Sequence, residues 1–244
     1  MHTVLGGLIL YPRPAAFDVI RHYRDFMLAA PDEVTAYVAL LHTPDGMPVV
    51  GVIPCYCGAG LAEGERVLAP LRRFGAPVMD AVQPLPMPAM QSLLAAPFPD
   101  GNQNYWKAAM ARALSGEAIQ VAVEHANRAP SPLSAIAIEY YAGAAGRVAN
   151  DATAYPHRDV PWHVVILAQW TNPADFPLHR DWARSAAAAL QPFSHSAQFL
   201  SVIDADGDDA VGHAFGANLP RLQAVKAKYD PANFFRVNQN IKPA

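Results

Sequence analysis

Residues 34–56, VTAYVALLHTPDGMPVVGVIPCY, decide the fold class of this 244-residue chain. Two apolar runs, Val34 to His42 and Pro48 to Tyr56, flank the turn sequence Pro44-Asp45-Gly46. Apolar runs joined by a short turn that contains glycine are typical of an antiparallel β-hairpin. We therefore expect neighbouring strands of an antiparallel sheet here.

Outward from the hairpin, the sequence predicts helices and strands in a mixed order. Helices are expected over residues 15–30, 61–74, 115–127 and 175–190 and before Asp230, and strands over residues 105–114, 134–145, 162–171 and 199–203. Ser115 is the expected N-cap of its helix. The Pro-rich residues 83–99, which contain a short helical pattern, are expected to form a surface excursion. Because strands and helices do not alternate strictly, the predicted fold class is α+β, an antiparallel β-sheet covered by helices on one face.

The composition favours one globular domain and excludes several classes of function. The chain is 52% hydrophobic and 16% charged, with a net charge of −3, and its 18 Lys and Arg residues are scattered. This pattern argues against a nucleic-acid partner. No apolar run approaches the roughly 18 residues that span a bilayer, and the N-terminus lacks a basic leader, so we expect no membrane contact and a cytoplasmic location.

The cysteines and histidines do not form a metal-binding pattern. Cys55 and Cys57 are the two cysteines of the chain, and the nine histidines show no H-E-x-x-H or H-x-H spacing. Two thiols without a nearby histidine fall short of the usual four ligands of a zinc site. Buried, reduced thiols at the end of a strand are the simpler interpretation, and no metal site is predicted.

The C-terminal residues 226–243, KAKYDPANFFRVNQNIKP, form a distinctive tail. Apolar residues at helical spacing precede Lys226 and Lys228, which lie where cations favour the last turn of a helix. Asp230-Pro231 then ends that helix. The following run, Asn233 to Asn240, is too polar for plain core, so we expect it to pack on one side and to hydrogen-bond on the other.

Four further stretches are distinctive motifs, in this order along the chain. They are GGLILYP at 6–12, NQNYWKAAM at 102–110, IEYYAGAAG at 138–146 and TAYPHRDVPWHVVILAQW at 153–170. Together with the tail they resemble the substrate-binding and C-terminal part of the berberine-bridge-enzyme-like FAD-linked oxidoreductases, of the vanillyl-alcohol-oxidase type. The resemblance extends from Gly6 to Pro243.

The resemblance implies candidate catalytic residues. His157 and Arg158 match the P-H-R before a strand of the substrate domain, where a tunable proton and a fixed charge could face an electron-rich group. Their alternative role is structural, with Arg158 paired to Asp159 or another carboxylate. Tyr105 and Lys107 alternate to the same face of a strand and could present a phenol and an ammonium together. Their alternative is a core tyrosine with an outward-pointing lysine.

The resemblance also implies FAD as the cofactor, with the tail against the ring side of the flavin. The expected cofactor-binding residues are Asn233, Phe235, Asn238, Gln239, Asn240 and Ser201. Two departures from the family pattern bear on catalysis. Phe199, Leu200 and Ser201 replace the usual Tyr-x-Asn, and Ala145 stands where some members carry an acidic base, so neither position supplies a general base.

Residues 1–244 are expected to be a single substrate-binding domain that includes a C-terminal berberine-bridge-like segment at about 198–244. The N-terminal FAD-binding domain of the family is expected to be absent, since no glycine-rich phosphate cradle is present. The predicted function is thus one half of an FAD-dependent oxidoreductase that oxidises an alcohol-like or phenolic small molecule. It would need a separate FAD-binding partner chain. The alternative is a redox-inactive small-molecule binding or interaction module, and a homodimer is a further expected partner state.

Overall fold

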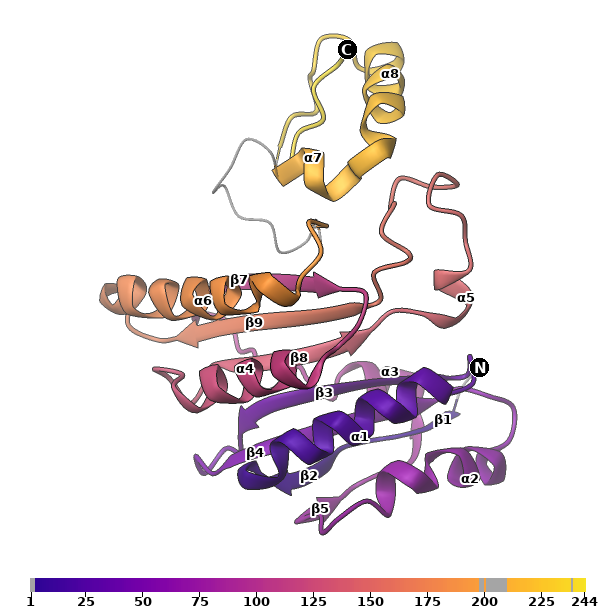
Figure 1. Cartoon of the computed structure of the whole chain (residues 1–244), viewed down its shortest axis with the longest axis vertical. Coiled ribbons are helices and arrows are strands. Elements are labelled where there is room, and N and C mark those ends of the chain that lie inside the picture. The colour runs from indigo at the N-terminus through magenta and orange to yellow at the C-terminus, as the bar shows by residue number, and fades with distance from the viewer. Residues whose placement is uncertain (1–2, 198–199, 201–209, 238) are drawn as a thin grey trace.

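A computed structural model describes residues 3–197, 200, 210–237 and 239–244. Its centre is one antiparallel sheet, in the strand order β5-β2-β4-β3-β8-β9-β7, and β1 pairs with β4 and β6 beside this path (Figure 1). The strands are β1 Thr3–Gly6, β2 Ile9–Pro12, β3 Val34–His42, β4 Pro48–Tyr56, β5 Met79–Asp80, β6 Gln83–Pro86, β7 Gln103–Ala111, β8 Ala135–Tyr140 and β9 Trp162–Trp170. The predicted α+β class with an antiparallel sheet is confirmed.

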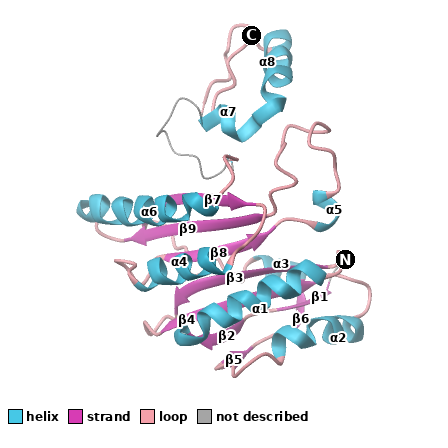
Figure 2. Ribbon diagram, in the orientation of Figure 1, coloured by secondary structure: helices cyan, strands magenta, loops and turns pink. Residues whose placement is uncertain are grey.

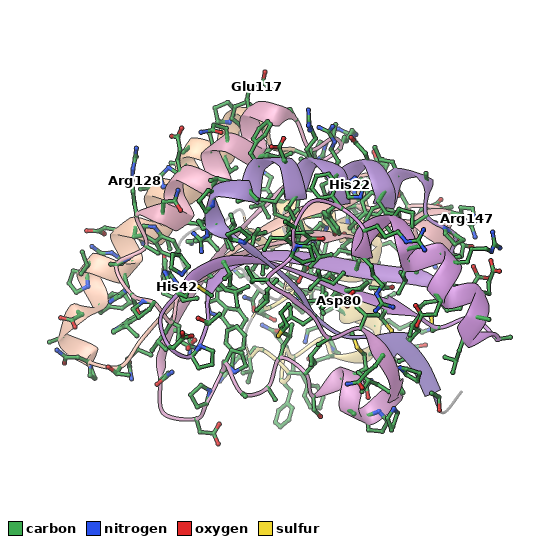
Figure 3. All side chains as sticks on the ribbon, turned by 90° about the horizontal axis from the view of Figure 1, so that it is seen from below. His22, His42, Asp80, Glu117, Arg128 and Arg147 are labelled. Atoms are coloured by element: carbon green, nitrogen blue, oxygen red, sulfur yellow. The ribbon has the colours of Figure 1, made fainter. Side chains whose placement is uncertain are left out.

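Helices cover one face of this sheet, as predicted (Figures 2 and 3). They are α1 Ala16–Ala29, α2 Leu61–Arg72, α4 Gly116–Asn127 and α6 Phe176–Leu190, with the short α3 Met87–Gln91 and α5 Gly143–Gly146 elsewhere. His22 on α1 and Glu117 on α4 lie on the helical side in Figure 3. The α1, α4 and α6 helices contact β3, β8, β7 and β9, so the core lies between the helices and the sheet.

The β3–β4 hairpin matches the prediction to the residue. Its turn is closed by backbone hydrogen bonds between Thr43 and Met47 at 2.9 Å and from Gly46 N to Thr43 O at 2.8 Å. Gly46 has φ of 85°, a conformation that side chains disfavour. The glycine of this turn therefore sets the register that brings Val34 opposite Tyr56.

The helix and strand predictions are largely confirmed, with small shifts at their ends. Ser115 caps α4, its hydroxyl accepting from the amide of Ala118 at 3.1 Å. The strand expected over 134–145 ends at Tyr140, because α5 follows it. The strand expected over 199–203 lies mostly outside the described residues.

The N-terminal strands and β6 were not predicted. Gly7 separates β1 from β2 with φ of 153°, and a Cβ there would lie 2.3 Å from the carbonyl oxygen of Ala81. Only glycine fits this close approach. Residues 83–86 of the expected surface excursion instead pair with β1, Gly6 lying opposite Gln83. The prolines of β6 are tolerated because the strand pairs only with β1 in the described residues.

A buried arginine ties the hairpin to the helical layer. Arg13 is 7% exposed and donates to the carbonyls of Val49 at 3.1 Å and Leu41 at 2.7 Å and to Asn127 Oδ1 at 3.0 Å. Burial lowers the pKa of Arg13. Hydrogen bonds to carbonyls and to the last residue of α4 satisfy its donors in place of a carboxylate.

The C-terminal segment lies beside the long loop between α5 and β9 (Figure 1). It comprises α7 Ala210–Phe215, α8 Leu219–Tyr229 and the residues that follow. Asn218 donates to the carbonyls of Asn150 at 2.7 Å and Thr153 at 3.0 Å. These bonds fasten the segment to the loop rather than to the sheet. No helix in the described part of the chain is long and apolar enough to cross a membrane.

Candidate functional site

A row of polar side chains crosses the face of the sheet that α1, α4 and α6 leave uncovered, which we call the open face. Tyr37 on β3 stands directly opposite Glu139 on β8, and Glu139 directly opposite His163 on β9. Their chain neighbours Val38, Ile138 and Val164 belong to the core. Because side chains alternate along a strand, the three polar residues point away from the helices.

Tyr141, which follows β8, completes this polar row. Its hydroxyl donates to Glu139 Oε2 at 2.7 Å. Its ring centre lies 4.7 Å from the ring of His163 and 6.5 Å from that of Tyr37. A hydrogen bond from its amide to the carbonyl of Pro161, at 2.8 Å, fixes its backbone. Glu139 is thus bonded to a tyrosine whose ring lies near those of His163 and Tyr37.

This environment changes the acid–base properties of the row. Burial raises the pKa of Glu139, and the hydrogen bond from Tyr141 offsets part of that rise. Burial and then the charge of Glu139 raise the pKa of Tyr37. Burial lowers the pKa of His163 to about 4. Near neutral pH, the row therefore combines a carboxylate more basic than usual with phenolic donors and a neutral imidazole.

Beside the polar row, the open face is apolar. The next row carries Ala39, Ala137, Val165 and Ala108 on β3, β8, β9 and β7. The row after it includes Leu41, Ala135, Leu167 and Trp106. Trp106 is 38% exposed and makes an edge contact with Phe98, at 5.8 Å between ring centres. A proton acceptor therefore stands at the edge of a flat apolar surface.

Tyr105 and Lys107 lie on the opposite, helix-covered face. Tyr105 is 8% exposed and belongs to the core, and its hydroxyl accepts from Arg184 Nε of α6 at 3.1 Å. The Lys107 ammonium lies 5.3 Å from the centre of the Tyr105 ring. Both side chains share a face, as predicted, but the structure does not bring them to Glu139. The buried position of Tyr105 matches the alternative interpretation, that of a tyrosine in the core.

His157 and Arg158 lie in the loop before β9 and fasten the C-terminal segment and the loop itself. His157 Nε2 is 2.7 Å from the carbonyl oxygen of His213. Arg158 donates to the carbonyl of Ala145 at 2.9 Å and to Thr153 Oγ1 at 2.8 Å. Asp159 instead pairs with Arg112, at 2.7 Å. The pairing of Arg158 with Asp159, one of the alternatives, is not what the structure records.

The predicted cofactor residues are described only in part. Asn238, Ser201 and Phe199 lie outside the described residues. Asp230 anchors the beginning of the tail, accepting from the amides of Phe234 at 2.7 Å and Phe235 at 3.0 Å while it pairs with Lys226. Lys226, followed by these amides, holds the pKa of Asp230 below its usual range. The backbone at Phe235 is thus fixed, while its side chain is 75% exposed.

The tail can meet a flavin ring in part. The side-chain oxygens of Asn233 and Asn240 are buried without a hydrogen-bond partner among the described atoms. Such acceptors suit a ring edge that carries an N–H group. Phosphates need a different site, and the short loop Gly58-Ala59-Gly60 between β4 and α2 lacks the glycine spacing of a dinucleotide-binding fingerprint. The residues therefore fit the ring of FAD and not its pyrophosphate.

The sequence prediction missed Tyr37, Glu139, Tyr141 and His163. The acidic base was sought at Ala145, which lies in α5, beyond the sheet. The available signal was a charged residue between the apolar Ile138 and the aromatic Tyr140 of a predicted strand. The pairing of Glu139 with Tyr37 and His163 depends on strand register, which the sequence did not specify. No cluster of three or more metal-binding side chains occurs among the described residues.

Comparison with known proteins shows what the chain is similar to. Residues 198–242 match the family described as "Berberine and berberine like". A FAD-linked oxidoreductase of Dictyostelium discoideum is 23% identical over 97% of this chain and 51% of its own length. A carbohydrate oxidase of Microdochium nivale is 35% identical over 40% of this chain and 21% of its own.

A solved structure also matches nearly all of this chain. The 6-hydroxy-D-nicotine oxidase of Arthrobacter nicotinovorans superposes with a TM-score of 0.83 and 25% identity, over 99% of this chain and 55% of that chain. Both proteins match nearly all of this chain, but the chain spans only about half the length of each of them. It is therefore similar to a C-terminal part of the berberine-bridge-enzyme-like FAD-linked oxidoreductases, as its motifs predicted.

Proposed function

From this relationship, we propose that the chain is the substrate-binding and C-terminal half of an FAD-dependent oxidoreductase. It would oxidise an alcohol-like or phenolic small molecule together with a separate half that holds most of the FAD. The observation that carries the proposal is the hydrogen-bonded pair of Glu139 and Tyr141 on the open face, 2.7 Å apart. A basic carboxylate on an otherwise apolar surface suits the removal of a substrate proton.

The division of labour follows from the chemistry. When bound, the flavin would supply the redox step by taking a hydride from a substrate carbon. Loss of that hydride leaves the substrate one proton in excess, and the hydroxyl proton would pass to Glu139. Tyr141 would hold the carboxylate in place through its hydroxyl. The apolar rows that include Val165 and Leu167 would exclude water from the reacting atoms.

The C-terminal tail supports the need for a second half. Phe234, Phe235 and Val237 are 77%, 75% and 84% exposed, although Asp230 fixes their backbone. Ordered, exposed apolar side chains in sequence mark a surface that another molecule covers. In this proposal the FAD-binding half covers them and supplies the phosphate cradle.

The test is reconstitution with FAD and a second half. That half would be the part of the Dictyostelium discoideum relative that this chain does not cover. We expect bound, spectrally shifted flavin in the mixture, and anaerobic bleaching of its visible bands by a suitable phenol or alcohol. Glu139→Gln should slow the bleaching by about 10²- to 10⁴-fold while bound FAD is unchanged.

The matched control is Glu124→Gln, at an exposed position of α4, which should bleach at the unaltered rate. Equal rates for Glu139→Gln and the unaltered chain would exclude Glu139 as the proton acceptor. Failure of the mixture to retain more FAD than the second half alone would exclude the split-enzyme proposal.

The exposed tail also favours a second candidate, a redox-inactive binding or interaction module. In this case Phe234, Phe235 and Val237 would bind another protein or a second copy of the chain. Light scattering after size-exclusion chromatography would separate a homodimer from a monomer. Loss of the dimer in Phe234→Ser and Phe235→Ser, together with no flavin binding in any mixture, would favour the module.

A further inference from the structure

The open face offers a ligand one anionic group. In the described rows of β3, β8, β9 and β7, Glu139 is the one carboxylate. The hydroxyl of Tyr141 already donates to it, and Tyr37 stands directly opposite it on β3. A carboxylate oxygen has room for more than one donor. The polar row is therefore suited to accept a single N–H or O–H group from a ligand.

Apart from the indole N–H of Trp106, the surface beside Glu139 lacks hydrogen-bonding side chains over a considerable length. Along β9, His163 belongs to the polar row, Val165 and Leu167 to the apolar rows, and Gln169 to the next polar position. A strand rises about 3.4 Å per residue, so His163 and Gln169 lie about 20 Å apart. The two apolar rows between them are long enough for a fused ring system.

The polar side chains at the far end are already paired with one another. Asn102 Nδ2 donates to Gln169 Oε1 at 3.2 Å, and Gln169 Nε2 donates to Asn104 Oδ1 at 3.3 Å. Gln169 is fully buried. This amide cluster therefore stabilises the strand ends and presents little to a ligand.

We infer that the open face binds a flat, mainly apolar ring system with one hydrogen-bond donor, a phenolic hydroxyl or a protonated amine, directed at Glu139, and that it does not bind a carbohydrate. The inference rests on the proposed function for the location of the site and names its ligand class. A sugar placed on the rows of Ala137 and Leu167 would lose water from several hydroxyls without gaining partners, and each unpaired group costs about 1–3 kcal/mol. A flat ring loses no such bonds, and its apolar area gains on burial.

The test measures binding of small probes to the purified chain. The probes are 2-naphthol, 2-naphthylmethylamine, naphthalene and maltotriose, followed by calorimetry and by tryptophan fluorescence, since Trp106 borders the surface. We expect saturable binding of the two naphthalene derivatives that carry a donor, at least tenfold weaker binding of naphthalene, and none of maltotriose.

Variants connect that binding to the named residues. Glu139→Gln should weaken both donor probes, and the protonated amine by a larger factor than the naphthol because the charge is lost. Ala137→Leu and Ala108→Leu, on neighbouring strands, should each weaken all flat probes by filling the row. Glu124→Gln and Ala188→Leu, at exposed positions of α4 and α6, are the matched controls and should bind as the unaltered chain does.

Three results would overturn the ligand class, and the first two are binding of maltotriose as tight as that of naphthol and an unchanged naphthol dissociation constant in both Glu139→Gln and Ala137→Leu. Absence of binding by any flat probe would overturn it as well. These outcomes differ from failure of the proposed function. Probe binding without any flavin bleaching leaves the ligand class standing, whereas bleaching by a carbohydrate keeps the oxidoreductase and removes the ligand class.

Discussion

The two faces of the central sheet use the same strands for different purposes. On β9, Trp162, Val164 and Ile166 point to the helices and are at most 3% exposed. Their neighbours on the open face are His163, Val165 and Leu167, which follow the polar and apolar rows. The helix-covered face stabilises the fold, and the open face carries the candidate chemistry. Substitutions on adjacent residues should therefore differ in kind as well as in size.

The largest difference is expected between Ile166→Ala and Leu167→Ala. Ile166 is fully buried in the core, so its truncation leaves a cavity and should lower the free energy of unfolding by about 2–5 kcal/mol. Leu167 is only partly buried on the open face, and its truncation should cost less than half as much. Urea denaturation followed by circular dichroism measures both. Equal losses would mean that the open face is also core.

His163 is an exception to the contrast between a buried and an open face, since it lies on the open face and is only 1% exposed. Its pKa is about 4 in the folded chain against an ordinary 6.5, so the unfolded chain binds more protons between these values. Stability is therefore lost as pH falls through this window, by up to about 3 kcal/mol at 1.4 kcal/mol per pKa unit. Thermal unfolding from pH 7 to 4 should show this decline.

In His163→Asn the decline over the same window should be shallower. His213→Gln, at an exposed position of α7, is the control and should keep the full decline. If both variants follow the unaltered chain, the acid sensitivity comes from other groups.

Arg13 tests whether the covered face depends on apolar packing alone. In Arg13→Met the carbonyls of Val49 and Leu41 lose their donor, and the free energy of unfolding should fall by about 2 kcal/mol. Arg66→Met removes an exposed pair with Glu63 and should change stability by less than about 1 kcal/mol. A neutral Arg13→Met would show that the hairpin is held by packing.

The smallest global effect is expected in the C-terminal segment, which contacts neither face of the sheet in the interactions described above. Asp230→Ala should release the backbone at Phe234 and Phe235 without lowering the unfolding transition of the sheet. Chymotrypsin should then cut near these residues faster than in the unaltered chain. Asp100→Ala, at an exposed loop position, should not change the cutting rate.

Local patterns made most of the fold predictable from the sequence. The turn at Gly46 and the cap at Ser115 act through neighbouring residues, and both were found. Gly7 was not recognised as a break between two strands, because its φ is imposed by the approach of Ala81 from a distant part of the chain. The strands at 3–6 and 83–86 were missed for the same reason.

The candidate site was predictable only as a family resemblance. His157 and Arg158 were recognised by their motif, and the structure shows them holding the loop and the C-terminal segment. Glu139 could be recognised as a site residue only together with Tyr37. Tyr37 precedes it by about a hundred residues and lies opposite it only because their two strands pair. Without the register of β3 and β8, the sequence could not reveal that contact.

The edge of the sheet at β7 has a consequence for how the chain behaves in concentrated solution. β7 is nine residues long and has one paired strand, β9, in the described residues. A long edge strand is a template for pairing with other molecules and a hazard for aggregation. The amide of His195 bonds to the carbonyl of Met110 at 2.6 Å, which occupies one end of that edge. Loss of this bridge would leave more of β7 open to pairing with another chain.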